Sequence, residues 1–86
     1  MDNKVLIKLF VPEIDDCFDL FIPVNEVIWK IKKMIVKCVN DVDGVNLDMN
    51  KDYLLVSKNE GKIYKNNELI IDTDIRNTCE LLLISV

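Results

Sequence analysis

The first two apolar stretches of the chain have the alternating pattern of β-strands. Residues 4–11 are rich in β-branched and aromatic side chains, and Pro12, which has no N–H to donate to a ladder, ends them. Residues 17–22 repeat the alternation, and the polar segment 13–16 between the two stretches is short enough for a turn. The pattern therefore predicts an antiparallel hairpin at the start of the chain.

Between residues 27 and 39 the apolar positions recur every three or four residues, which is the period of an α-helix. The stripe consists of Val27, Ile28, Ile31, Met34, Ile35 and Cys38. Asn25 is expected to cap the helix N-terminus, and Asn40 or Gly44 to end the helix. The rest of the helix surface carries Lys30, Lys32, Lys33 and Lys37. Such a charge run is typical of a solvated face.

The second half of the chain contains shorter apolar runs. A loop is expected over residues 41–51, followed by a strand over 52–57 and a very short strand at 63–64. The apolar residues of segment 69–75 are expected to tuck under the domain. Residues 78–85 are predicted to form the last strand, which is strongly apolar.

One amphipathic helix needs one apolar sheet face to cover it. The first and last strands are the most apolar, so we expect them side by side in the sheet centre, and the long connection between them permits parallel pairing. The sequence predicts a single α+β domain over residues 1–86, with a mixed sheet of four to five strands packed on one helix.

From residue 4 to residue 84 this order resembles the β-grasp fold of ubiquitin. Residues 23–35 are similar to the helix entry of ubiquitin-like domains, where a proline and a polar cap precede apolar residues three and four apart. Segments 54–57 and 61–69 resemble the third strand, turn and short strand of that family, and 80–84 resembles its last strand. The resemblance implies a domain that binds other proteins.

Within this fold, the small size, the acidic balance and the missing tail resemble the YukD/EsaB group. These are small bacterial ubiquitin-like proteins attached to type VII (WXG100) secretion systems. The resemblance implies a cytosolic accessory protein whose partners are secretion-system components. An alternative is a ubiquitin-like modifier or sulfur carrier, which needs a flexible Gly-Gly tail for adenylation. The chain shows Leu83-Ile84-Ser85-Val86 instead, so we expect no conjugation.

Charge and composition narrow the range of partners. The formal net charge is −4, whereas nucleic-acid binding needs clustered cations, so we expect no nucleic-acid partner. No apolar run is long enough to span a bilayer and no signal peptide opens the sequence, so we expect no membrane insertion. The cysteines Cys17, Cys38 and Cys79 are odd in number and form no C-x-x-C pair. We expect free, mostly buried thiols in a reducing cytoplasm.

The residues offer little chemistry. The chain contains no histidine, so the commonest general base is missing and a thiol nucleophile would lack its usual partner. The best metal-like pattern lies at residues 41–44, but an EF-hand aligned on Gly44 would begin at Val39 and end at Asn50, neither of which fits. We expect an Asp-rich turn there, no metal, no cofactor and no enzymatic activity.

Apolar residues are expected on both faces of the central strands. A sheet with one face in water should alternate apolar and polar positions, and these strands do not. We therefore predict a protein-binding patch. Its members are Leu6, Phe10, Leu55, Leu82 and Ile84, with Trp29 of the helix as a second candidate. Two alternatives stay open: the 69–75 segment or the termini cover the patch, or a second copy of the chain docks on it as a homodimer.

Overall fold

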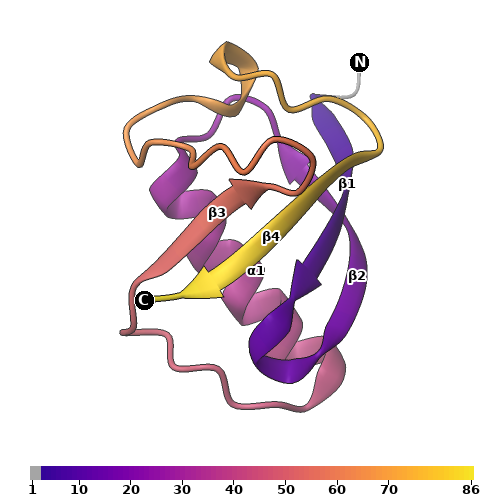
Figure 1. The fold of residues 1–86 in the computed structure, drawn as a ribbon, viewed down its shortest axis with the longest axis vertical. Coiled ribbons are helices and arrows are strands. Elements are labelled where there is room, and N and C mark those ends of the chain that lie inside the picture. The colour runs from indigo at the N-terminus through magenta and orange to yellow at the C-terminus, as the bar shows by residue number, and fades with distance from the viewer. Residues whose placement is uncertain (1–2) are drawn as a thin grey trace.

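The computed structural model describes residues 3–86 and contains one helix packed on one face of a four-stranded sheet (Figure 1). The strands are β1 (Lys4–Val11), β2 (Asp16–Pro23), β3 (Tyr53–Ser57) and β4 (Cys79–Ser85), and the helix is α1 (Ile28–Asp43). The sheet order is β2-β1-β4-β3, with β1 parallel to β4 and the other pairs antiparallel. The α+β prediction with neighbouring terminal strands is confirmed.

The strand register fixes which residues form the core. Ile7, Leu9 and Val11 of β1 point toward α1 and are at most 1% exposed. Their neighbours on β4, Leu81 and Leu83, are fully buried. On the opposite side of the core, the helix buries Ile28, Ile31, Ile35, Val36 and Val39. Apolar burial at roughly 25 cal/mol per Å² is the main force that holds α1 on the sheet.

Both ends of α1 differ from the sequence expectation. The helix has Val27 at its N-cap with no side-chain cap, so the prediction for Asn25 is wrong. Instead, the first helical N–H groups, those of Ile28 and Trp29, donate to the carbonyls of Glu68 and Asn66. Backbone carbonyls of residues 66 and 68 thus accept the N–H groups at the helix start, which a capping side chain would otherwise accept.

The C-terminal end of α1 lies at Asp43, so the loop expected from residue 41 begins three residues later. Gly44 follows in the left-handed conformation (φ 66°) and donates its N–H to Asn40 O. Glycine is suited to this position because it has no Cβ to clash. The Asp-rich residues 41–43 are therefore the last turn of the helix and not a turn of their own.

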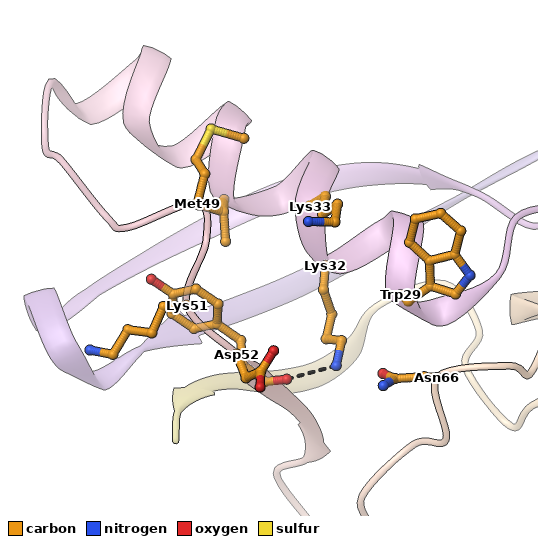
Figure 2. A pocket seen from close by; sticks show the side chains of 9 residues that line it. Trp29, Lys32, Lys33, Met49, Lys51, Asp52 and Asn66 are labelled. Atoms are coloured by element: carbon orange, nitrogen blue, oxygen red, sulfur yellow. Dashed lines mark hydrogen bonds between the residues drawn. The ribbon is translucent and has the colours of Figure 1, made fainter.

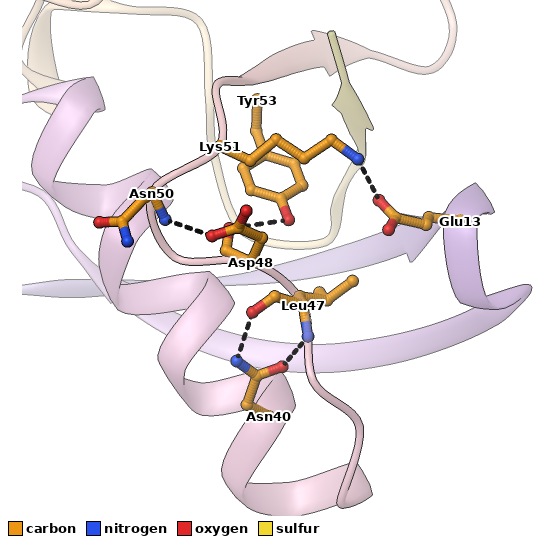
Figure 3. Close-up of polar contacts among 7 residues, drawn as sticks. All are labelled: Glu13, Asn40, Leu47, Asp48, Asn50, Lys51 and Tyr53. Atoms are coloured by element: carbon orange, nitrogen blue, oxygen red, sulfur yellow. Dashed lines mark hydrogen bonds and ion pairs between the residues drawn. The ribbon is translucent and has the colours of Figure 1, made fainter.

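The side chain of Asn40 hydrogen-bonds the loop after α1 to the helix (Figure 3). Asn40 donates through Nδ2 to Leu47 O at 3.0 Å and accepts from Leu47 N through Oδ1 at 2.8 Å. At the far end of the loop, the Tyr53 hydroxyl donates to Asp48 O at 3.1 Å. These bonds hold buried Leu47 in the core cluster.

Residues 63–64 form no strand, since only a single bridge joins Ile63 to Val56. Ile70 and Ile75 of the following meander are buried, as expected, but Ile71 is 53% exposed. The meander is held by the bonds Ile70 N to Glu26 O and Ile71 N to Val24 O, which place it at the N-terminal end of α1. No helix among residues 3–86 is long and apolar enough to cross a bilayer.

Tyr64 connects the short bridge to the meander, and it provides a test of the fold's pH dependence. Its buried hydroxyl donates to Asp74 Oδ1 at 2.7 Å, and this bond lowers the pKa of the Asp74 carboxyl. A carboxylate with a lowered folded pKa stabilises the fold above its unfolded pKa, and this contribution is lost as the pH falls through the folded value.

We expect Tyr64→Phe to lose about 1 kcal/mol of unfolding free energy at neutral pH, because one partly buried hydrogen bond disappears. The gap between the wild type and the variant should shrink as the pH falls from about 4 to about 2. Urea titrations across this range measure it. A gap that stays constant with pH would show that Asp74 is not stabilised by the Tyr64 hydroxyl.

Candidate protein-binding surface

The face of the sheet turned away from α1, here called the outer face, lies toward the viewer in Figure 1. Cross-strand pairing lines up four apolar residues on it. Phe10 pairs with Leu82, Leu82 pairs with Val56, and Val56 bridges to Ile63. We call these four residues the apolar row. Beside it, Leu54 pairs with Ile84 on the same face.

Accessibility varies along the apolar row, and only its last member, Ile63, is largely exposed. Phe10 and Leu82, over the central strands, are half-buried by their neighbours, and Val56 is 7% exposed. Ile63, beyond the edge strand, is 55% exposed. Leu54 and Ile84 are also half-buried. Together they form a continuous apolar surface where an antiparallel pair of strands would ordinarily carry polar residues.

Charged residues border this surface on one side. Lys8 lies opposite Asp19 on β2 and Glu80 on β4, and Lys58 forms an ion pair with Glu80 at 3.8 Å. This charged row separates the apolar row from Leu6, which pairs with the 64% exposed Phe21 near the other end of the sheet. Leu6 is thus on the predicted face but apart from the other predicted residues.

Two predicted patch residues lie elsewhere. Leu55 is fully buried opposite Leu83, so the expectation that it faces outward is wrong, and Leu54 takes its place. The four residues 53–56 are all apolar, so no alternation in the sequence fixes which of them face the core. Trp29 is on α1, in the layer on the other side of the sheet, and its side chain is 44% exposed.

Neither the meander nor the last residue lies over Phe10 and Leu82. The meander is bonded to the segment before α1, and Val86 donates its N–H to Asp52 O beside the start of β3. The residues of this surface that sequence reasoning missed are Leu54, Val56 and Ile63. The alignment of Ile63 with the row depends on the single bridge to Val56. No local signal marks that long-range contact.

The surface offers contact area and one exposed free thiol, Cys17. All three thiols are free, but Cys17 is exposed beside Phe10 on the outer face and the other two are half-buried, so the expectation of mostly buried thiols is wrong. Cys79 pairs with Ile7 on the core side, and burial raises the pKa of its thiol, which disfavours the nucleophilic thiolate form. Among residues 3–86 no group of three His, Cys, Asp or Glu side chains is placed to hold a metal ion. The outer face is best described as a surface that a protein could cover.

No family model and no curated protein matches the chain. Solved structures do match. The N-terminal ubiquitin-like domain of a larger protein, solved in solution, is 15% identical, covers 100% of this chain and 78% of its own, and superposes with a TM-score of 0.68. The ubiquitin-like (UBL) domain of Plasmodium falciparum Dsk2 is 18% identical, with 96% and 99% covered and a TM-score of 0.70. The fold is a ubiquitin-like β-grasp.

The same β-grasp occurs within a longer chain of the MycP5-free ESX-5 inner membrane complex. That match is 9% identical, covers 99% of this chain and 21% of the other, and has a TM-score of 0.71. At such low identities, the three likenesses establish the fold alone.

Proposed function

We propose that this β-grasp is a non-catalytic, non-conjugating module that binds another protein through the outer face. The observation that carries the proposal is the continuous apolar surface formed by the apolar row with Leu54 and Ile84. Exposed apolar patches of this kind usually serve as interaction sites, since leaving them in water is unfavourable. A partner that covered them would remove apolar area from water on both sides.

The arrangement of charge around the patch supports the same proposal. Protein interfaces commonly have an apolar centre and a polar rim, with charged residues depleted at the centre. Here the rim is supplied by Lys8, Asp19, Glu80 and Lys58. These exposed charges add little affinity by themselves, but they favour one orientation of a partner with complementary charges.

For the partner we propose a component of a bacterial type VII secretion system, reached from the cytoplasm. The support is the resemblance to the YukD/EsaB group in size and acidic balance. The presence of the same fold in a chain of the ESX-5 inner membrane complex is in keeping with it. Self-association through the outer face is the competing outcome, because both copies would then supply the same patch.

The substitution Ile63→Lys tests the proposal. Ile63 is exposed and outside the strands, so a lysine there should leave the fold intact while placing a charge in an apolar contact. We expect partner affinity to fall by about tenfold or more, because the lysine puts a charge against apolar groups of the partner. Ile71→Lys is the matched control, since Ile71 is 53% exposed but lies in the meander.

The measurement is quantitative pull-down from the native host with wild type, Ile63→Lys and Ile71→Lys, followed by identification of the recovered proteins. We expect the wild type and Ile71→Lys to recover secretion-system components, and Ile63→Lys to fail to recover them. Equal recovery by the two variants would refute the outer face as the docking surface. Analytical ultracentrifugation of the same three proteins detects self-association.

A further inference from the structure

A second surface lies on the helix side of the molecule, between α1 and the segment that leads into β3 (Figure 2). Trp29, Lys32 and Lys33 of α1 form one wall. Met49 and Lys51 line the other side, and Asn66 lies near Trp29 at one end. We call this the helix-side groove. The groove and the outer face meet at the edge of β3, where Lys32, Asp52, Tyr53 and Asn66 of the groove line a second pocket together with Leu54 and Ile63.

We propose that the helix-side groove binds an acidic segment of a partner protein that carries an apolar anchor residue. The residues that carry this inference are distinct from those of the outer face, which contributes none to the groove lining. Its basis is the combination of clustered cations, unpaired hydrogen-bond donors and two exposed apolar side chains in one concave place.

The charge of the groove is opposite to that of the rest of the molecule. Its lining carries Lys32, Lys33 and Lys51 against a single acid, Asp52, and so has two net positive charges. The whole chain has a net charge of −4, so everything outside the groove carries six net negative charges. An acidic segment is therefore attracted to this groove and repelled by the remaining surface.

Lys32 is held in place before any ligand arrives. Its ammonium donates to Tyr53 O at 2.7 Å, as the dashed line in Figure 2 shows. Burial lowers the pKa of the Lys32 ammonium, and the nearby Asp52 carboxylate opposes this change. A cation that is already ordered and partly desolvated loses less conformational entropy when a carboxylate binds beside it.

Other donors in the groove are available to a ligand. Within residues 3–86, the Lys33 ammonium, the Trp29 indole N–H and the Asn66 side-chain amide have no hydrogen-bond or ion-pair partner. Lys51 forms an ion pair with Glu13 at 3.8 Å, but both side chains are more than one-third exposed, so a ligand can compete for it. These donors fit carboxylate oxygens.

The apolar part of the groove fits one anchor side chain. Trp29 is 44% exposed and Met49 is 43% exposed. Trp offers a large rigid contact surface, and Met adapts to the shape of its partner. Lys30 lies 5.6 Å from the centre of the Trp29 ring, which keeps the positive charge close to this anchor site.

A nucleic acid is the less favoured polyanion. Its phosphate backbone extends beyond any short groove, and it would meet the six net negative charges outside the lining. A peptide segment can place a few carboxylates in the groove and leave the rest of the surface untouched. The choice between the two is an outcome of the experiment.

The test uses Trp29 as its own reporter, since it is the single tryptophan of the chain. The probe is a short, capped, Glu-rich peptide with one central Phe, and its counterpart has Lys in place of every Glu. We expect the Glu-rich peptide to change the Trp29 fluorescence saturably, with an affinity that falls as salt is added. We expect the Lys-rich peptide to leave the fluorescence unchanged.

Two charge reversals localise the binding. Lys33→Glu should weaken binding of the Glu-rich peptide by about fivefold or more, because it reverses a positive charge in the groove lining. Lys37→Glu makes the same change in net charge on the same helix, outside the lining, and should weaken binding less than about twofold. Circular dichroism confirms that both variants are folded.

Three results would overturn the proposal. They are no saturable response to the Glu-rich peptide, equal weakening by the two reversals, and a response to single-stranded oligothymidylate as strong as the response to the peptide. The last result would show a general polyanion site and not a peptide site.

Discussion

Leu55→Ala should lower the unfolding free energy by about 3 kcal/mol, within the range of roughly 2–5 kcal/mol for leucine truncations in a packed core. Leu55 is fully buried, lies opposite the fully buried Leu83, and belongs to the single core cluster beneath α1. Its removal leaves a cavity that the sheet and the helix cannot close. Urea or guanidinium titration of the purified variant measures the loss.

The neighbouring residue is the matched control for this prediction. Leu54 is on the outer face and half-buried, so Leu54→Ala should cost about 1 kcal/mol and leave partner binding weakened. The two substitutions differ only in the side of β3 on which they fall. If Leu54→Ala proved the more destabilising, Leu54 and not Leu55 would face the core. The residues assigned to the outer face on β3 would then be wrong.

Asn40→Ala is expected to lower the unfolding free energy by about 2 kcal/mol, which is large for a partly buried polar side chain. The substitution removes both hydrogen bonds to the backbone of Leu47 at once (Figure 3). It leaves the N–H and carbonyl of Leu47 without these partners in a residue that is 5% exposed. The loop after α1 should then open more readily than the rest of the fold.

Hydrogen exchange tests the local part of this prediction. The amide of Leu47 should lose protection in Asn40→Ala, whereas amides in the centre of β4 should keep theirs. Asn46→Ala is the control, because Asn46 is exposed in the same loop and makes no such bonds. Equal destabilisation by the two substitutions would contradict the role given to Asn40.

The sequence predicted the order of the elements because each has a strong local signal. The β1–β2 hairpin follows from alternation and from Pro12, and Gly44 marks the helix end. The predicted apolar stripe of the helix correctly included the buried residues Ile28, Ile31 and Ile35. It was wrong about the residues on either side of them. The structure buries Val36 and Val39, while Met34 is 46% exposed. Both flanks are apolar, so the periodicity alone could not decide the helix rotation.

The surface was less predictable than the fold, for physical reasons that differ between residues. Leu54 and Leu55 are chemically identical, and only the pairing with β4 decides which of them faces outward. Ile63 joins the apolar row through one long-range bridge. Trp29 has its position set by the carbonyls of residues 66 and 68, which cap α1 from far along the chain. Tertiary contacts, and not local patterns, decided each of these.

The two proposed surfaces give the domain a specific architecture. The outer face is apolar with a charged border, and the helix-side groove is basic with two exposed apolar side chains. The two surfaces meet at the edge of β3, where Leu54 and Ile63 line a pocket with Lys32 and Asn66. Substitutions away from this shared edge, such as Leu82→Lys and Lys33→Glu, should each leave binding at the other surface intact, since distant sites generally contribute independently.

Site-specific photo-cross-linking in the native host tests the central claim most directly. A photoreactive phenylalanine derivative replaces Ile63 in one protein and Ile71 in another, two positions of nearly equal exposure at 55% and 53%. We predict a discrete cross-linked product from position 63, its loss when Leu82→Lys is added, and no such product from position 71. Cross-linking from position 71 alone, or cross-linking from position 63 that is insensitive to Leu82→Lys, would contradict the outer face as the docking surface.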